Sequence, residues 1–260
     1  MKKLMLVMLL ALSVTACATK NAENVLTISE KNTVALRLPI MSDTASRVGD
    51  ELLQKSRKLS KNEPIYLVLD TPGGSIEDGL KLVEVAKSLP RPVHTISIFN
   101  ASMGFVISQY LDDRYVLDSS VMMSHRAFIG GMRGEYPGSL ISRFLALGNQ
   151  LMNINSKVAE RAEMPLKTYL DITANELWMG SDQAIELKFA DKKIILQCDE
   201  SLSGYGEPES VNLGFFSVKV QFHKCPLISQ PKVISGDSKI INEFVNDKIE
   251  FLRKYNFFLK

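Results

Sequence analysis

Two short apolar segments of this chain each lead into a turn of small residues, and each turn is followed by a helical pattern. The segments span 65–70 and 93–99, and the turns span 72–75 and 100–104. Strands that alternate with helices in this way form βαβ units, which predict a largely parallel sheet with right-handed crossovers. At each turn, backbone N–H groups gather at a helix N-terminus, where the helix dipole favours negative charge.

The whole pattern predicts one α/β domain followed by a small α+β extension. The chain has 260 residues, of which 45% are apolar, enough to bury one sizeable core. We expect the main domain over 31–198 and the extension over 199–260. In the main domain we expect strands at 33–38, 65–70, 93–99, 114–118 and 120–125, and helices at 42–59 (capped by Ser42 or Asp43), 75–89, 103–111 and 138–162. In the extension we expect a strand or hairpin at 211–222, a linker at 226–237 and an amphipathic helix at 240–255.

The N-terminal leader, residues 1–16, has the pattern of a cleaved secretion signal. Two lysines precede an apolar run at 4–12 that is too short to span a bilayer. Small residues and Cys17 follow, and this arrangement resembles a bacterial lipobox, with cleavage before Cys17 and lipidation of its thiol. An ordinary signal peptide that leaves a free cysteine is the alternative. Because Ala18 stands where an aspartate would favour inner-membrane retention, we expect an outer-membrane lipoprotein facing the periplasm, with 17–30 as its tether.

The charge balance excludes some classes of partner. Removing the leader lowers the number of basic residues from 31 to 29, which equals the 29 acidic residues. A net charge near zero argues against nucleic acid as a partner and gives no electrostatic reason to bind acidic lipid. Membrane attachment would therefore depend on the acyl chains at Cys17.

The other two cysteines, Cys198 and Cys225, form an even pair in an oxidising compartment. A disulfide between them would close a loop of about 27 residues and contribute roughly 3 kcal/mol of stability by the loop-entropy relation. Two unpaired, buried thiols are the alternative.

The motifs at the turns supply the parts of an acyl-transfer site. Ser102 occupies the turn after the second apolar segment, Gly73 and Gly74 occupy the turn after the first, and His125 ends a later apolar strand. A serine hydroxyl needs an adjacent general base before it can attack a carbonyl, and backbone N–H groups can stabilise the resulting oxyanion. The alternative is structural: a serine that only caps the following helix, and a tight glycine turn without function.

The order and spacing of these motifs resemble those of the proteolytic subunit of the Clp protease, in the ClpP/crotonase superfamily. A PGGS turn at 72–75 precedes an ASMG turn at 101–104, and the histidine at position 125 follows Ser102 by 23 positions. The resemblance covers about 33–195. It implies a ClpP/crotonase-like fold of repeated β-β-α units, a Ser102 nucleophile and a His125 general base. It also implies a homo-oligomer that associates through the long helix after position 138 and acts on peptides or proteins.

Two acidic residues are candidates for the third catalytic position. The family carries an aspartate shortly before an S-A-x-E-A helix start, and matching that start to 180–184 brings Glu176 to the aspartate's position. Asp171, five residues earlier, is the alternative. Either carboxylate would orient His125 and stabilise its imidazolium. The glutamate departs from the family's pattern by one methylene.

The backbone N–H groups of Gly74 and Met103 are the expected oxyanion hole. Glycine at positions 73 and 74 permits conformations that a residue with a Cβ cannot easily adopt. Losing one donor of this kind costs about 3 to 4 kcal/mol of transition-state stabilisation.

These features predict a lipid-anchored serine endopeptidase. We expect no use of ATP, because the chain contains no P-loop motif and the periplasm lacks ATP, and we expect no other cofactor and no metal. A catalytically silent relative that serves as an oligomeric scaffold or binding module is the alternative from another class. The enoyl-CoA hydratase branch of the superfamily is disfavoured, because it uses acidic catalytic residues and coenzyme A. A Ser/Lys dyad would need Lys157 or Lys167 to reach Ser102.

Overall fold

The computed structural model divides the chain into two compact units, residues 1–197 and 198–260. It describes residues 24–127, 135–213, 216–228 and 231–235. The leader, Cys17 and the helix expected at 240–255 lie outside these ranges. Within the described ranges, no helix combines the length and the hydropathy needed to cross a membrane.

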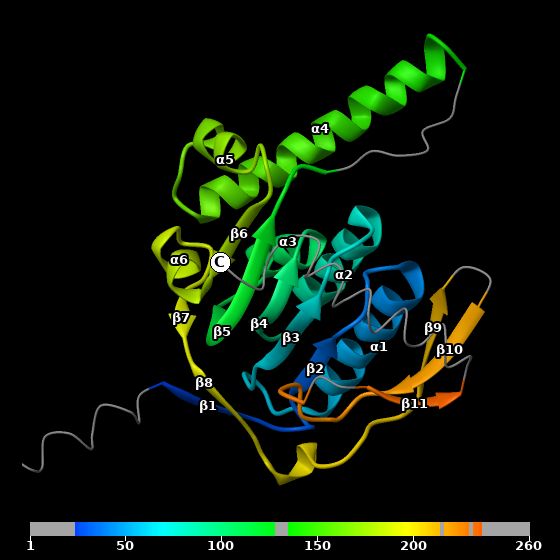
Figure 1. The fold of residues 1–260 in the computed structure, drawn as a ribbon, viewed down its shortest axis with the longest axis vertical. Coiled ribbons are helices and arrows are strands. Elements are labelled where there is room, and N and C mark those ends of the chain that lie inside the picture. Colours follow the sequence, from blue (N-terminus) through cyan, green and yellow to red (C-terminus); the bar gives the residue numbers. More distant parts are fainter. Residues whose placement is uncertain (1–23, 128–134, 214–215, 229–230, 236–260) are drawn as a thin grey trace, which may run out of the picture. The chain divides into compact units, whose positions relative to one another are not determined.

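The first unit is built on a mixed sheet in which neighbouring strands follow the order β2-β3-β4-β5-β6 (Figure 1). The strands are β2 (Thr33–Leu36), β3 (Ile65–Thr71), β4 (Val93–Ala101), β5 (Arg114–Ser124) and β6 (Leu177–Gly180). Strands β2 to β5 are parallel to one another, β6 is antiparallel to β5, and the short β7 (Lys192–Lys193) pairs with β5 in parallel. This mainly parallel sheet with helical crossovers confirms the predicted α/β fold class.

The helices that connect the parallel strands form a buried core with the sheet. They are α1 (Ser42–Lys58), α2 (Ile76–Ser88) and α3 (Met103–Tyr110). Alternate residues of β3 point to the same face of the strand and join one apolar cluster with residues of all three helices. Buried members of that cluster include Ile65, Leu67, Leu69, Val48, Leu52, Leu82 and Ile107. The period of two in the strand and the apolar faces of the helices explain why these segments fold together.

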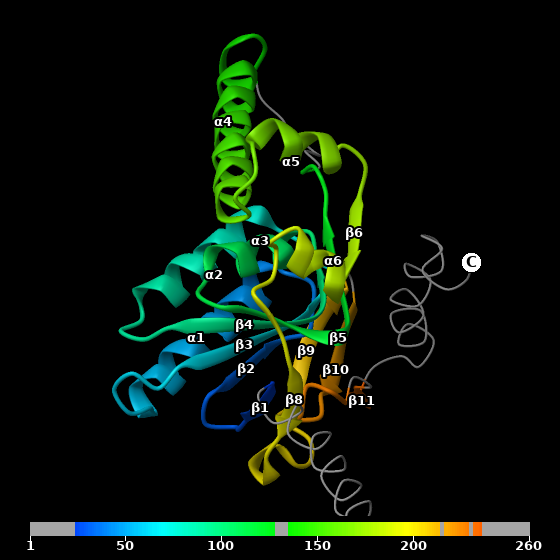
Figure 2. The same ribbon diagram turned by 90° about the vertical axis from the view of Figure 1, so that its left-hand side faces the viewer.

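A second apolar cluster joins α3 to the helices that follow β5. These helices are α4 (Gly138–Arg161), α5 (Leu166–Ile172) and α6 (Ser181–Glu186), and Figure 2 shows α4 and α5 side by side. Phe105 and Phe189, both fully buried, meet edge to face with ring centroids 5.2 Å apart, and Tyr169 packs on Phe189. Helix α3, which begins at Met103, thus packs into both apolar clusters.

The structure corrects two expected element boundaries. The strands expected at 114–118 and 120–125 form one strand, β5. Ser120 Oγ accepts from the Leu117 N–H at 2.6 Å and donates to the Ser97 carbonyl at 2.6 Å, and these bonds carry β5 past an irregularity in its register with β4. Helix α1 already begins at Ser42, so its N-cap residue is Met41 and not Ser42 or Asp43.

Part of the expected tether belongs to the fold. Val25–Ile28 forms β1, which pairs with β8 (Ile195–Cys198) in a separate two-stranded sheet. The side chain of Ile28 is fully buried, which explains why this segment is ordered against the unit instead of extending from it.

The second unit contains a three-stranded antiparallel sheet and a disulfide. After a single 3₁₀ turn (Glu200–Leu202), β9 (Glu209–Leu213) and β10 (Phe216–Gln221) pair as a hairpin, as expected. Strand β11 (Lys232–Ser235) pairs with β10, so the linker expected at 226–237 is wrong for these residues.

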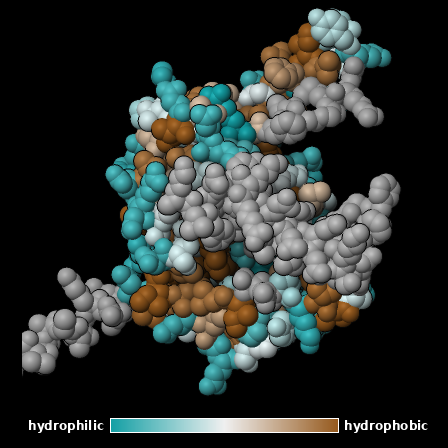
Figure 3. Space-filling model, viewed as in Figure 1, coloured by the Kyte–Doolittle hydropathy of each residue, from teal (hydrophilic) through white to brown (hydrophobic). Residues whose placement is uncertain are grey.

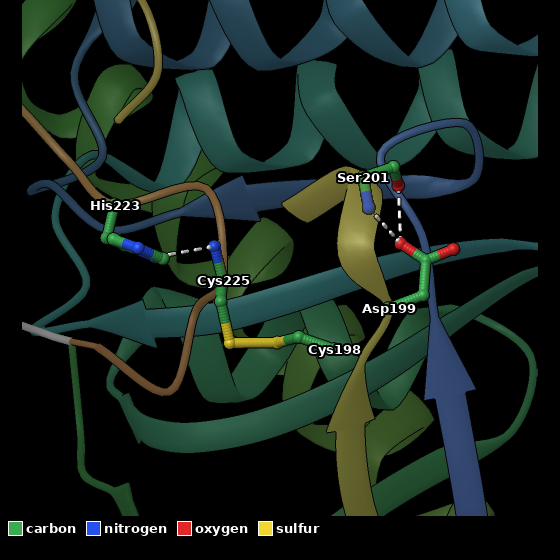
Figure 4. The surroundings of a disulfide bond; sticks show 5 residues. All are labelled: Cys198, Asp199, Ser201, His223 and Cys225. Atoms are coloured by element: carbon green, nitrogen blue, oxygen red, sulfur yellow. Dashed lines mark hydrogen bonds between the residues drawn. A yellow bond between two sulfur atoms is a disulfide. The ribbon is translucent and has the colours of Figure 1, made fainter. Parts of the chain in front are cut away.

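The disulfide of the second unit joins Cys198 to Cys225, the pair that the cysteine count favoured (Figure 4). Local hydrogen bonds fix the backbone near both cysteines. His223 Nδ1 accepts from the Cys225 N–H at 3.1 Å, and the Asp199 carboxylate accepts from the Ser201 N–H at 2.9 Å. The bridge links residues 27 positions apart.

Candidate active site

Ser102 lies at the sharp turn between β4 and α3. Its backbone has φ 56° and ψ −119°, a region that residues with a Cβ rarely adopt. Its N–H donates to the Met123 carbonyl at 2.9 Å, which ties the turn to the neighbouring strand β5. The side chain makes no capping bond to α3, so the structure does not support a serine that only caps a helix. Strained backbone of this kind at a strand-to-helix turn is typical of nucleophile positions.

The Ser102 hydroxyl is hydrogen-bonded to His125, with 2.7 Å between Oγ and Nε2. The pairing of β4 with β5 explains this proximity, because Ala101 is in register with Met123 and each strand places its next residues at the same edge of the sheet. Both side chains are half-buried. The other two histidines are elsewhere: His94 accepts from the Asp113 N–H and His223 lies in the second unit.

The lysines that a Ser/Lys dyad would need are engaged away from Ser102. Lys167 pairs with Asp171 at 2.6 Å, and Lys157 lies over the Tyr110 ring at 5.1 Å from its centroid. The geometry therefore favours His125 as the base.

Two backbone hydrogen bonds hold the turn that contains Gly74, one of the two expected oxyanion donors. The Ile40 N–H donates to the Gly73 carbonyl and the Ser75 N–H donates to the Ile40 carbonyl, both at 2.8 Å. These bonds fix the strand-like segment around Gly74 and leave its own N–H unused. Among the described residues, neither the N–H of Gly74 nor that of Met103 has a hydrogen-bond partner. Both N–H groups therefore remain the candidate donors to a developing negative charge.

Replacing Gly74 with alanine should reduce catalysis strongly. Gly74 has φ +147°, and an added Cβ would lie 2.3 Å from the Ile40 carbonyl oxygen, so the backbone must shift. We expect kcat to fall by about 10²- to 10³-fold, the typical effect of losing one oxyanion donor. Steady-state kinetics measure this effect. Gly148→Ala is the matched control, since nothing lies within 4 Å of its added Cβ, and an equal loss in both variants would contradict the assignment.

A buried polar network links β4, the strand before the turn at Ser102, to α3, the helix after it. The sequence analysis did not predict this network. The Asn100 side-chain amide donates to Ser97 Oγ at 2.9 Å and to Ser108 Oγ at 3.2 Å, which links β4 to α3. Gln109 then connects Ser108 to Arg114, whose guanidinium Nη1 donates to Gln109 Oε1 at 2.5 Å. The only sequence signal was the presence of polar residues inside apolar segments.

The network ends in an ion pair between Arg114 and Asp191. The guanidinium contacts both carboxylate oxygens, Nε at 3.0 Å and Nη2 at 2.6 Å. Burial opposes the charge of Asp191, but these hydrogen bonds hold its pKa below the ordinary value. The two-point contact fixes the start of β5 against the segment after α6.

A second unpredicted contact anchors the end of β5 next to His125. Ser124 Oγ and the Tyr169 hydroxyl are 2.8 Å apart and both groups are buried. Burial raises the pKa of Tyr169, so the phenol stays neutral and serves as a hydrogen-bonding group. This bond attaches the end of β5, directly before His125, to α5.

The two candidates for the acidic position are placed differently. Asp171 is exposed and held by Lys167 on its own helix. Glu176 immediately precedes β6, and the antiparallel register pairs Ser124 with Leu177, so the next step of that register aligns His125 with Glu176. The Glu176 carboxylate accepts from Trp178 Nε1 at 3.0 Å. Among the described residues, no carboxylate is bonded to the His125 ring.

The described residues contain no cluster of side chains that could hold a metal ion. A serine that is hydrogen-bonded to a histidine and lies at the N-terminus of a helix is the nucleophile–base arrangement needed for acyl transfer.

Comparisons with known proteins agree with this geometry. The family model described as Clp protease matches residues 18–197. The chain is 29% identical over 157 residues to ATP-dependent Clp protease proteolytic subunit 1 of Prochlorococcus marinus subsp. pastoris, covering 58% of this chain and 78% of that protein. It is 26% identical over 160 residues to ATP-dependent Clp protease proteolytic subunit 2 of Treponema pallidum, covering 60% and 79%.

The matched region contains the whole sheet with Ser102 and His125 at its edge, and it ends where the first compact unit ends. This chain therefore belongs to the Clp protease family.

Proposed function

We propose that this protein is a serine endopeptidase that cleaves peptide bonds through an acyl-enzyme at Ser102. The observation that carries the proposal is the 2.7 Å hydrogen bond between Ser102 Oγ and His125 Nε2 at a strained turn. Membership of a peptidase family supports it.

The geometry suggests how each residue takes part. His125 Nε2 accepts the hydroxyl proton as Ser102 Oγ attacks the peptide carbonyl carbon. The N–H groups of Gly74 and Met103 donate to the oxygen that becomes negative. The imidazolium then gives its proton to the leaving amine, the peptide C–N bond breaks, and an ester to Ser102 remains. Water, deprotonated by His125, hydrolyses that ester and restores the serine.

A fluorophosphonate probe tests the nucleophile directly, because it reacts with activated serines only. We expect one label per chain, located at Ser102 by mass spectrometry and absent in Ser102→Ala. Ser88, whose hydroxyl donates to the Val85 carbonyl on an exposed helix end, is the internal control and should stay unlabelled. No label at Ser102 in the purified full chain would reject the proposal.

We also propose that the peptidase acts as a lipoprotein on the periplasmic side of the outer membrane, without ATP. The lipobox-like sequence before Cys17 supports the anchor. The relatives are named as proteolytic subunits of an ATP-dependent Clp protease, whereas the compartment proposed here lacks ATP.

Replacing Cys17 with serine should release the protein into the soluble periplasmic fraction or block its processing, because acyl chains would be the anchor. Fractionation followed by immunoblotting measures this change. Unchanged sedimentation with the membranes would contradict the lipoprotein assignment.

A homo-oligomer is the third part of the proposal. Large apolar side chains are exposed at the N-terminal end of α4, and Figure 3 shows hydrophobic residues gathered there. They are Ile141, Phe144 and Leu145, with Met152 two turns further along. Exposed apolar patches of this kind are typical of contacts between proteins.

One observation favours the catalytically silent scaffold as a second candidate. His125 has no carboxylate partner among the described residues, and position 176 carries glutamate where the family carries aspartate. Full biological activity of Ser102→Ala would support the scaffold.

A further inference from the structure

The side chain of Trp178 donates a hydrogen bond to the carboxylate of Glu176, which lies two positions earlier in the chain. Residues two apart on a strand project to the same face of the sheet. Met123 is in register with Trp178, so the following steps place Glu176 and His125 on that same face. The indole Nε1–H donates to Glu176 Oε2 at 3.0 Å. The indole thus binds one carboxylate oxygen of Glu176, the residue that the continued register aligns with His125.

The direction of the indole is itself fixed by packing. The Trp178 ring lies 6.2 Å from the ring of Phe99, centroid to centroid, with 36° between their planes. Phe99 belongs to β4, the strand that ends at the nucleophile turn. Trp178 is half-buried, and Nε1–H is the only hydrogen-bond donor of its side chain. The indole that binds Glu176 therefore packs against β4, the strand that leads into the turn at Ser102.

A glutamate at this position needs such a support more than an aspartate would. Its side chain has one more rotatable bond, and Glu176 is exposed, so an unsupported carboxylate would sample many rotamers. With Oε2 held by the indole, Oε1 remains available to accept from His125 Nδ1–H. Hydrogen bonds of this kind often tighten only when substrate binds and charge develops on the imidazole.

We propose that Trp178 is a positioning residue that binds one oxygen of Glu176, so that the other oxygen orients His125 and stabilises its imidazolium. This inference rests on the proposed peptidase function. It deepens that function by explaining how the longer acid serves at the family's aspartate position.

The test is Trp178→Phe, which keeps an aromatic ring against Phe99 and removes the Nε1–H. We expect kcat and the rate of fluorophosphonate labelling to fall by about tenfold, the size typical of losing an outer hydrogen-bond partner, while KM stays unchanged. In a Glu176→Gln background the same substitution should have no further effect, because the carboxylate that Trp178 holds is already gone.

A second variant keeps the test valid if phenylalanine disturbs packing. Benzothienylalanine at position 178 preserves the shape of the indole and replaces the N–H with sulfur, and it should reproduce the loss seen with phenylalanine. Thermal unfolding of each variant shows whether the fold is retained.

Three results would overturn the role of Trp178. The first is wild-type rates in both variants. The second is an equal loss in the wild-type and Glu176→Gln backgrounds, which would indicate a structural role only. The third is a faster rate, which would mean that Trp178 holds Glu176 away from His125.

The labelling experiment separates this inference from the function on which it rests. If the wild-type chain is not labelled at Ser102, the proposed function fails and the role of Trp178 fails with it. A labelled wild type with unaffected variants rejects the role of Trp178 alone.

Discussion

Ser102→Ala and His125→Ala should each lower peptide hydrolysis by about 10⁶-fold, to the background of the assay. In the proposed mechanism the serine supplies the atom that attacks the substrate and the histidine removes its proton, so neither can act without the other. Both side chains are only half-buried, and we expect the free energy of unfolding to change little. Hydrolysis of a fluorogenic peptide and thermal unfolding measure the two properties on the same samples.

The double variant Ser102→Ala, His125→Ala should be no worse than either single variant, because both residues serve one step. The matched control is His94→Ala. His94 lies between the rings of Tyr66 and Tyr115, each 5.8 Å from it, and takes no part in the site. Losses that add in the double variant, or a comparable loss in His94→Ala, would contradict a shared mechanism at Ser102.

Glu176→Gln should lower kcat by about 10²- to 10³-fold with little change in KM. A buried triad carboxylate is worth about 10⁴-fold, and we expect less here because Glu176 is exposed and solvent screens its charge. The glutamine has the same shape but cannot stabilise the imidazolium that forms as Ser102 loses its proton. Steady-state kinetics with the same peptide give kcat and KM separately.

Asp171→Asn is the control for this prediction. Asp171 pairs with Lys167, whose pKa it raises through their hydrogen bond, and we expect the variant to keep wild-type turnover. If Asp171→Asn lowers kcat strongly while Glu176→Gln keeps the wild-type kcat, Asp171 is the catalytic acid. If neither substitution matters, the site is a Ser–His dyad or is not catalytic at all.

The sequence was sufficient to predict strands β2 to β5 and the helices α1 to α3 that connect them, because local patterns specify them. Strands β6 and β7 were not among the expected elements. The continuous apolar run of β3 and the apolar face of α2 are each visible within a few residues. The continuity of β5 was not predictable, since it depends on Ser120 bonding to Ser97 on another strand. The role of Val25–Ile28 as a strand was missed for the same reason, because its partner β8 lies at the far end of the unit.

The site was predictable to the extent that a motif places its backbone. Ser102, His125 and Gly74 follow from two turns and one strand end, and the structure brings Ser102 and His125 together. The supporting side chains were not predictable. Tyr169 reaches Ser124 across 45 positions, and Asn100 acts through serines that look like ordinary polar residues. Contacts of this kind depend on how elements pack, which periodicity does not reveal.

The backbone of Ser102 has a consequence for how this protein evolves. A non-glycine residue at φ 56° and ψ −119° costs on the order of 1 to 3 kcal/mol of folding free energy. Glycine would adopt the same angles with less strain, so a lineage that no longer needed the hydroxyl would gain stability by losing it. Selection for stability alone would therefore favour replacing the serine, and the proposed catalytic role supplies the opposing selection that would keep it at this strained position.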